Sequence, residues 1–344
     1  MKPGLSVISP GLHTTVQDLG RLGYQALGVP VSGALDTPSL RLANALVGNP
    51  VNTAALEILF TGPRFEVTAP AVRVAVAGAG ASLVLARAGQ PVPAWLSVRL
   101  VCGEVFEVRL GREAVCAYLA VDGGLDVPQV LGSASTYVRA GLGGLYGRAL
   151  RAGDAVPLVI ERAPERRERR LPSPPPAGAR QPIRIVFGPQ HDGFAEPALR
   201  ALVTAEFRIS ANADRMGMRL EGPRLQHRAG WDIVSDAIAT GAIQVPGSGQ
   251  PILLLADHQT TGGYPKIATV ISADLPIVAR RRPGDAICFA AVTVEEAEAL
   301  AREAEHRLAA ALASLESVPA AGGDIDLASL YDRNLISGVV AADH

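Results

Sequence analysis

The chain has 344 residues, which is long enough for two domains that each bury a hydrophobic core. Its formal net charge of −1 lacks the basic excess that nucleic acids and anionic membranes require, so we expect neither as a partner. The first ten residues do not resemble a signal peptide, and no window reaches the roughly 18 consecutive apolar residues of a membrane span. We therefore expect a cytoplasmic protein.

The cysteines and histidines give no sign of a metal site. Cys102, Cys116 and Cys288 have no CxxC spacing and lie in apolar, strand-like contexts, and the six histidines are scattered. We expect reduced, buried thiols and no metal ligands.

Polar side chains gather in the glycine-rich N-terminal region. Residues 14–21 contain Asp18 and Arg21, and residues 33–36 end at Asp36. These residues could fold into one loop cluster that binds a substrate. The alternative, that an Asp18–Arg21 ion pair only holds a loop, stays open. A helix is expected over residues 37–46, ending before Gly48-Asn49-Pro50.

The rest of residues 1–160 favours an all-β domain. Short runs rich in Val, Leu and Ala are separated by Gly and Pro about every ten residues, a spacing typical of a barrel or sandwich. The runs span residues 73–86, 95–101, 105–110 and 114–121.

Residues 161–182 mark the clearest boundary. Five Arg and three Glu in the first ten residues are followed by a proline-rich run, so we expect an extended spacer. A second β-barrel is expected over residues 183–292, with a short helix near 194–202. Residues 59–65 resemble 219–225 and residues 151–156 resemble 282–287, which suggests that the two barrels are related.

The C-terminal part is expected to be helical. Thr293 and Glu296 form a capping box, and apolar residues between 297 and 315 fall on one face, so residues 293–316 are predicted to form one amphipathic helix. The tail, residues 317–344, is apolar enough to be a docking segment.

The richest polar segment follows a buried strand predicted at residues 251–256. A strand that ends in such a turn can aim several polar groups at one small ligand. A tight hairpin built on the two glycines is the alternative. The segment contains Asp257, Gln259, Thr260, Thr261, Gly262, Gly263, Tyr264 and Lys266.

Two other strings add candidates. Asp214 and Arg215 lie beside Gly217, and this combination suits recognition of a carboxylate. Gln244 lies in a predicted strand at residues 241–246, whose following glycines lack the order of a phosphate-binding loop.

Together, these strings resemble the allophanate hydrolase subunit 2 family, also described as the biotin-dependent carboxyltransferase A/B subdomain family. The resemblance covers about residues 5 to 300 and rests on residues 14–21, 33–36, 43–49, 214–220, 241–246 and 259–266. It implies two tandem cyclophilin-like β-barrels in a mainly β fold with few helices. It also implies a heteromeric complex with homologues of the A and B subunits of 5-oxoprolinase, in which ATP hydrolysis drives cleavage of 5-oxoproline to glutamate.

On this resemblance we expect Asp214, Arg215, Asp257, Gln259 and Lys266 to act in catalysis. The expected substrate-binding residues are Asp18, Arg21, Asp36, Gln244, Thr260, Thr261, Gly262, Gly263 and Tyr264. Relatives that carry Arg at the position of Lys266 favour a charge contact over Schiff-base chemistry.

Two other functions stay open. A carboxyltransferase component acting on urea or a similar amide would need biotin, but the chain has no Ala-Met-Lys-Met carrier string. A regulatory partner would instead antagonise a kinase inhibitor that resembles the B subunit.

Overall fold

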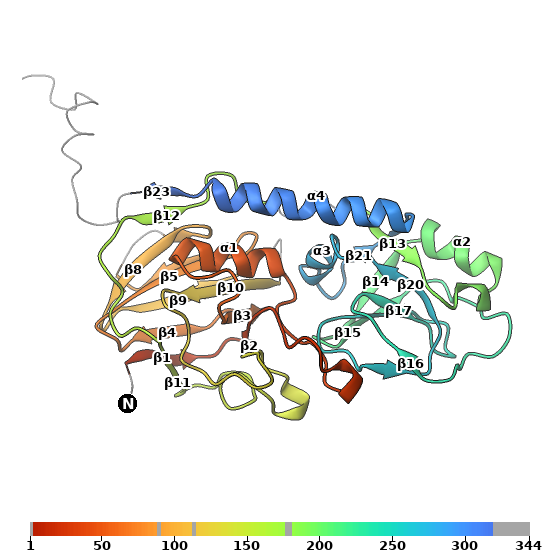
Figure 1. Cartoon of the computed structure of the whole chain (residues 1–344), viewed down its shortest axis with the longest axis horizontal. Helices are drawn as coiled ribbons and strands as arrows, with labels where there is room; N and C mark the ends of the chain where they lie inside the picture. The colour runs from red at the N-terminus through yellow and green to blue at the C-terminus, as the bar shows by residue number, and fades with distance from the viewer. Residues whose placement is uncertain (1–2, 88–90, 112–114, 176–180, 319–344) are drawn as a thin grey trace, which may run out of the picture.

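Two β-rich domains lie side by side, with one long helix across both (Figure 1). The computed structural model describes residues 3–87, 91–111, 115–175 and 181–318. Within these residues, no helix is both long and apolar enough to cross a membrane. The mainly β fold with two tandem barrels, few helices and a C-terminal amphipathic helix is confirmed.

The N-terminal domain comprises strands β1 to β11 and helix α1 (Thr37–Val47). One sheet has the order β11-β1-β4-β9-β6-β7 and the other has the order β2-β3-β10-β5-β8. Apolar side chains from both sheets form the core between them. The strands are β1 (Gly4–Ser9), β2 (His13–Gln17), β3 (Ala55–Leu59), β4 (Arg64–Val67), β5 (Ala71–Ala77), β6 (Ser82–Leu85), β7 (Val92–Pro93), β8 (Ser97–Val101), β9 (Val105–Arg109), β10 (Cys116–Val121) and β11 (Ala155–Pro157).

The C-terminal domain is built on an eight-stranded sheet with the order β21-β14-β15-β18-β17-β20-β13-β22. A separate pair, β16 (Asp236–Ala237) and β19 (Thr261–Gly262), joins two loops beside it, and helices α2 (Glu196–Thr204) and α3 (Leu275–Ala279) complete the domain. The main strands are β13 (Ile183–Phe187), β14 (Phe207–Ala213), β15 (Gly217–Glu221), β17 (Ala242–Gln244), β18 (Ile252–Leu254), β20 (Lys266–Val270), β21 (Ala286–Ile287) and β22 (Phe289–Ala291).

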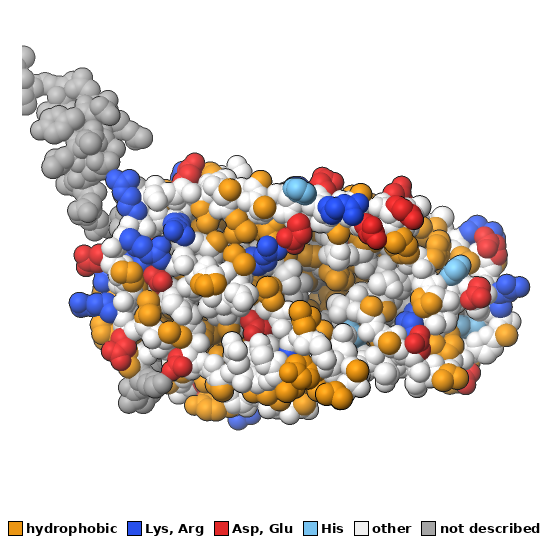
Figure 2. Space-filling view, viewed as in Figure 1, with side chains coloured by type: hydrophobic (Ala, Val, Ile, Leu, Met, Phe, Trp, Pro, Cys, Tyr) orange, Lys and Arg blue, Asp and Glu red, His pale blue; other side chains and the backbone are white. Residues whose placement is uncertain are grey.

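Helix α4 (Val294–Ala313) starts at the predicted capping box. The Thr293 hydroxyl accepts from the Glu296 backbone N–H, and the Glu296 carboxylate accepts from the Thr293 N–H. Leu308 is buried against the cluster that contains residues of α1, and Arg41 of α1 pairs with Glu305. The opposite face of α4 carries acidic and basic side chains (Figure 2), so the helix is amphipathic as predicted.

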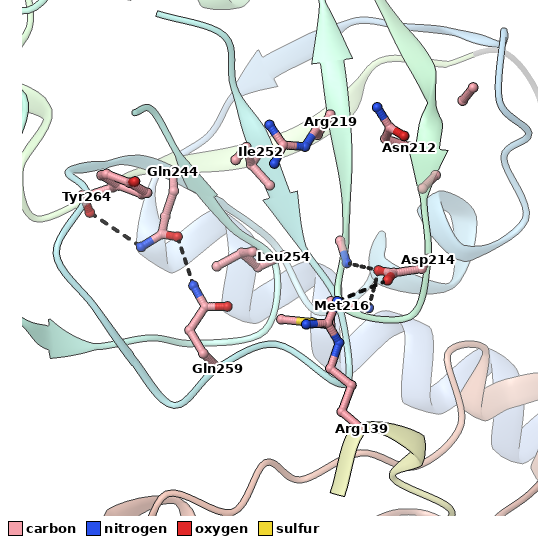
Figure 3. A pocket seen from close by; sticks show the side chains of 13 residues that line it. Arg139, Asn212, Asp214, Met216, Arg219, Gln244, Ile252, Leu254, Gln259 and Tyr264 are labelled. Carbon is pink, nitrogen blue, oxygen red and sulfur yellow. Dashed lines mark hydrogen bonds and ion pairs between the residues drawn. The ribbon is translucent and has the colours of Figure 1, made fainter. Parts of the chain in front are cut away.

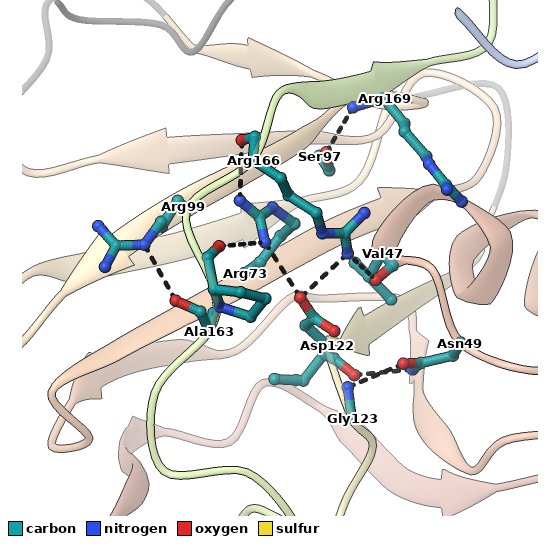
Figure 4. A network of polar contacts seen from close by, with 12 residues as sticks. Val47, Asn49, Arg73, Ser97, Arg99, Asp122, Gly123, Ala163, Arg166 and Arg169 are labelled. Atoms are coloured by element: carbon teal, nitrogen blue, oxygen red, sulfur yellow. Dashed lines mark hydrogen bonds and ion pairs between the residues drawn. The ribbon is translucent and has the colours of Figure 1, made fainter. Parts of the chain in front are cut away.

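Residues 161–171, the first part of the predicted extended spacer, contact the N-terminal domain. Strand β12 (Glu168–Arg170) pairs with β23 (Glu316–Val318), which returns the chain from α4 to the N-terminal domain. The fully buried Arg73 donates to Glu168 at 2.9 Å. It also donates to Asp122 at 3.0 Å (Figure 4). The charged run therefore satisfies a buried guanidinium, a role that composition alone does not reveal. All of the predicted docking tail after residue 318 lies outside the described residues.

One of the two pairs of similar segments, residues 151–156 and 282–287, forms the same turn in both domains. Arg151 N–H donates to the Asp154 carboxylate at 2.7 Å, and Arg282 N–H donates to Asp285 at 2.8 Å. Each turn then leads into a short strand, β11 or β21. In the other pair of similar segments, Gly62-Pro63 follows β3 and Gly222-Pro223 follows β15, but only Gly62-Pro63 leads directly into another strand, β4.

The three cysteines are free, but their burial differs. Cys116 is buried as expected and Cys288 is partly buried. Burial raises the pKa of the Cys116 thiol well above its ordinary value. The expectation of burial is wrong for Cys102, which is exposed in the turn between β8 and β9.

Candidate functional site

A row of side chains crosses the outer face of the C-terminal sheet. Arg219 of β15 pairs with Ile252 of β18, and Ile252 pairs with Gln244 of β17. Their neighbours Leu220, Leu253 and Ile243 belong to the domain core. Because side chains alternate along a strand, the row faces away from that core.

This row forms part of a polar pocket of about 560 Å³. Figure 3 shows Arg219 and Asn212 on the side of the pocket away from Arg139. Arg139 comes from a short turn, η2 (Val138–Ala140), of the N-terminal domain, so both domains line the pocket. The other lining residues are Ala211, Ala213, Asp214, Met216, Gly217, Gln244, Ile252, Leu254, Gln259 and Tyr264.

Some polar groups of the pocket are held by other protein groups. Asp214 accepts from the N–H groups of Met216 at 2.8 Å and Gly217 at 3.2 Å. It also lies 3.5 Å from Arg139, in an exposed pair. Gln259 Nε2 donates to Gln244 Oε1 at 3.3 Å, and Gln244 Nε2 donates to the Tyr264 carbonyl at 3.4 Å (Figure 3). These bonds fix the orientation of both carboxamides.

Other polar groups remain available to a ligand. Among the described residues, the Arg219 guanidinium, the Asn212 carboxamide, the Tyr264 hydroxyl and Gln259 Oε1 have no hydrogen-bond or ion-pair partner. The pocket therefore offers a cation, amide and hydroxyl donors, and acceptor oxygens around the apolar side chains of Ile252 and Leu254.

A second, more apolar cavity of about 390 Å³ adjoins this pocket between the domains. Both cavities are lined by Arg139, Ala213, Asp214 and Met216. His13 also lines the second cavity, and burial, followed by the nearby Arg215, lowers the pKa of its imidazole.

Arg215 and Asp257, both expected in catalysis, form a buried network at the domain interface. Arg215 Nε lies 2.9 Å and Nη2 lies 3.0 Å from the two Asp257 carboxylate oxygens. Arg215 Nη1 donates to Glu57 of the N-terminal domain, and Nη2 donates to the Gly33 carbonyl at 2.7 Å. Burial alone would lower the pKa of Arg215, but Glu57 and Asp257 raise it above its ordinary value. The two predicted residues line the second cavity and not the polar pocket.

Asp36 also has a structural role at this interface. Its carboxylate caps α1 by accepting from Ser39 N–H at 3.2 Å and the Ser39 hydroxyl at 2.7 Å. Arg280 of the C-terminal domain lies 2.7 Å from the same carboxylate. These contacts account for Asp36 without a substrate.

Asp18 and Arg21 hold a loop, but not by pairing with each other. Asp18 accepts from the hydroxyls of Ser133 at 2.6 Å and Ser135 at 2.5 Å. Arg21 donates to the Ser135 carbonyl at 2.5 Å. Both residues are buried and neither lines the polar pocket. The loop-holding alternative therefore describes them better than substrate binding does.

Lys266 is buried beside the pocket and not on its wall. Its ammonium lies 2.7 Å from Asp236 and holds the pKa of that carboxyl below its ordinary value. Thr261 and Gly262 form β19, which pairs with β16. Neither they nor Thr260 and Gly263 line the pocket. Residues 257–266 therefore form a hairpin-like pairing and also contribute Gln259 and Tyr264 to the pocket.

Four predicted residues therefore meet at the pocket, and three of its polar or charged side chains belong to residues that were not predicted. The four are Asp214, Gln244, Gln259 and Tyr264, and the three are Arg139, Asn212 and Arg219. Asn212 and Arg219 flank the predicted Asp214-Arg215 pair, so alternation along the two strands could have identified them. Arg139 had no such signal, because only the contact between the domains brings it there.

Comparison with known proteins agrees with this architecture. The family model of the carboxyltransferase domain, subdomain A and B, matches residues 27–291. The 5-oxoprolinase C subunit of Escherichia coli is 37% identical over 300 residues, which cover 85% of this chain and 93% of that protein. The Haemophilus influenzae protein of the same name is 36% identical over 301 residues, covering 88% and 95%.

A solved structure of the Kluyveromyces lactis urea carboxylase has the same fold. It superimposes with a TM-score of 0.82 at 28% identity, covering 95% of this chain and 30% of the carboxylase chain. The matches to the family model and to the two bacterial relatives each cover most of the chain. This chain therefore belongs to the carboxyltransferase domain, subdomain A and B, family.

Proposed function

We propose that this chain is the C subunit of an ATP-dependent 5-oxoprolinase and acts with homologues of the A and B subunits. The two bacterial relatives that carry the name of this C subunit support this reading, since the chain covers almost all of each. The polar pocket on the C-terminal sheet would hold the substrate, a five-membered cyclic amide that carries one carboxylate.

The observation that carries the proposal is the pair of oriented carboxamides in the pocket. Gln259 Nε2 donates to Gln244 Oε1, so Gln259 Oε1 can accept a hydrogen bond from the N–H of a cyclic amide. The Tyr264 hydroxyl, on the same side of the pocket, could donate to the amide carbonyl. A site that hydrogen-bonds both the N–H and the carbonyl oxygen of a cyclic amide binds the ring in one orientation.

The reaction needs an activated carbonyl. In the complex, transfer of the terminal phosphoryl group of ATP to the amide oxygen would supply that activation and release ADP. Water then adds to the carbonyl carbon, the ring C–N bond breaks, and the nitrogen takes a proton to give the amine of glutamate. Loss of the phosphoryl group as inorganic phosphate gives the new carboxylate. In this scheme the pocket binds and orients the amide, and the Tyr264 hydroxyl would stabilise charge that develops on the carbonyl oxygen.

Reconstitution tests the proposal. The chain would be purified with its A-type and B-type partner subunits, and glutamate release from 5-oxoproline would be measured with and without ATP. We expect ATP-dependent release that is lost when this chain is omitted. Gln259→Ala should raise KM about tenfold, as expected for a lost hydrogen bond. A stable complex that releases no glutamate would reject the proposal.

A biotin-dependent carboxyltransferase component is the second candidate. The likeness to the K. lactis urea carboxylase, over 95% of this chain, favours it. The apolar cavity beside the polar pocket would then hold the carboxyl carrier and the pocket would hold urea or a similar amide. This candidate predicts binding of biotin by the chain and carboxyl transfer only when a separate carrier is added.

A further inference from the structure

We infer that Arg219 is a specificity-determining residue that makes the pocket select an amide bearing a carboxylate over the same ring without one. This inference rests on the proposed function, and it assigns to Arg219 a part of the substrate that the carboxamides do not contact.

The first support is the free charge of Arg219. Its guanidinium has no hydrogen-bond or ion-pair partner in the described part of the chain, although it lines the pocket. The other charged lining residues, Asp214 and Arg139, face each other at 3.5 Å and largely balance. The pocket therefore keeps one uncompensated positive charge, which favours an anionic ligand.

The second support is the position of Arg219 in the sheet. Arg219, Ile252 and Gln244 are register partners on three consecutive strands. Neighbouring strands lie about 4.8 Å apart, so the backbones of Arg219 and Gln244 are about 10 Å apart. Both side chains are long enough to reach a small ring that rests on Ile252. The row thus offers a cation at one end, an apolar floor, and carboxamides at the other end.

The chemistry of the two ends fits a lactam acid. A guanidinium binds a carboxylate with two parallel N–H···O bonds, a geometry that fixes the direction of the ligand as well as its charge. With the carboxylate on Arg219, the ring amide points toward Gln259 and Tyr264. A neutral amide such as urea, or a lactam without the carboxylate, leaves Arg219 without its partner.

The test compares two substrates and three variants in the reconstituted complex. 5-Oxoproline carries the carboxylate, and 2-pyrrolidinone is the same ring without it. For Arg219→Gln we expect kcat/KM for 5-oxoproline to fall by about 10- to 100-fold, mainly through KM, with little change for 2-pyrrolidinone. Arg219→Lys should restore part of the loss because it keeps the charge. Arg224→Gln removes an exposed arginine outside the pocket and is the matched control.

Equal losses for both substrates in Arg219→Gln, or unchanged selectivity, would overturn the inference. Calorimetry on the same proteins measures the binding of the two ligands. This measurement tests the role of Arg219 separately from the proposed function. If wild type binds 5-oxoproline but no glutamate is released, the oxoprolinase proposal fails. Loss of that binding in Arg219→Gln alone would then still support the carboxylate role. If wild type binds 5-oxoproline and 2-pyrrolidinone equally well, Arg219 does not select for the carboxylate.

Discussion

Arg215 of the C-terminal domain donates to Glu57 of the N-terminal domain, and side-chain exposures of 5% and 0% exclude solvent from this ion pair. Glu57 is held in turn by the Tyr118 hydroxyl at 2.6 Å and the Leu35 N–H at 2.9 Å. Since Asp214 and Met216 line the polar pocket on either side of Arg215, this contact also sets the position of the pocket relative to Arg139.

Removing Arg215 should therefore destabilise the protein. Arg215→Ala leaves Glu57 and Asp257 buried without their cation, and we expect a loss of about 3 to 5 kcal/mol in the free energy of unfolding. Chemical denaturation measures this loss. Arg139→Ala breaks an exposed pair and should change stability by less than about 1 kcal/mol. Similar stability changes in the two variants would contradict the structural role of Arg215.

The sequence predicts secondary structure well where the signal is local. Helix α4 starts at the capping box of Thr293 and Glu296, and α1 covers the predicted residues 37–46 and ends one residue later, at Val47. These features depend on residues within one or two turns of each other.

Roles that depend on distant partners could not be predicted in this way. Arg215 and Glu57 are 158 residues apart, and a carboxylate–guanidinium pair has the same sequence pattern whether it binds a substrate or joins two domains. The contacts of Asp18 and Arg21 with Ser133 and Ser135, and that of Asp36 with Arg280, escaped prediction for the same reason. The pocket residues Gln244 and Gln259 were expected because their segments, residues 241–246 and 259–266, resemble those of the family.

The buried ion pair between Arg73 and Glu168, which holds residues 161–171 on the N-terminal domain, gives a second stability prediction. Glu168→Ala leaves the fully buried Arg73 without one of its two carboxylate partners, so we expect a loss of about 3 kcal/mol. Arg170→Ala, in the same short strand, removes only an exposed pair with Glu316 and serves as the control. Equal melting temperatures for Glu168→Ala and wild type would show that the segment does not support the domain.

The pH dependence of stability should contain a contribution from His258. Burial lowers the pKa of its imidazole, whose Nδ1 lies 2.6 Å from the Gln259 carbonyl and whose Nε2 lies 3.1 Å from the Thr240 hydroxyl. The unfolded chain therefore binds a proton at a higher pH than the folded chain. The stability contribution is complete above the unfolded pKa of about 6.5 and declines as the pH falls below it.

His258→Gln should remove that decline. Urea denaturation between pH 5 and pH 8 would show a shallower loss on the acidic side, by up to about 1.4 kcal/mol per pH unit relative to wild type. His306→Gln changes an exposed histidine on α4 and is the control substitution. Identical profiles for wild type and His258→Gln would show that the buried imidazole does not control acid stability.

Gly262 provides a test of the pocket that removes no polar group. A Cβ added at Gly262 would lie 2.8 Å from Ile238 Cδ1 and 2.9 Å from Gln244 Nε2. Gly262→Ala should therefore displace the Gln244 carboxamide and, through it, Gln259. We expect KM for the amide substrate to rise about tenfold, with kcat less affected.

The adjacent Gly263 is the matched control for this substitution. A Cβ at Gly263 would come no closer than 3.3 Å to a neighbouring atom, the Ile233 carbonyl oxygen, and would not approach either carboxamide. Gly263→Ala should leave KM close to the wild-type value in the reconstituted complex. If Gly262→Ala also leaves KM unchanged while both variants melt like wild type, the oriented carboxamides do not bind the substrate. The substrate site would then have to be sought in the apolar cavity between the domains.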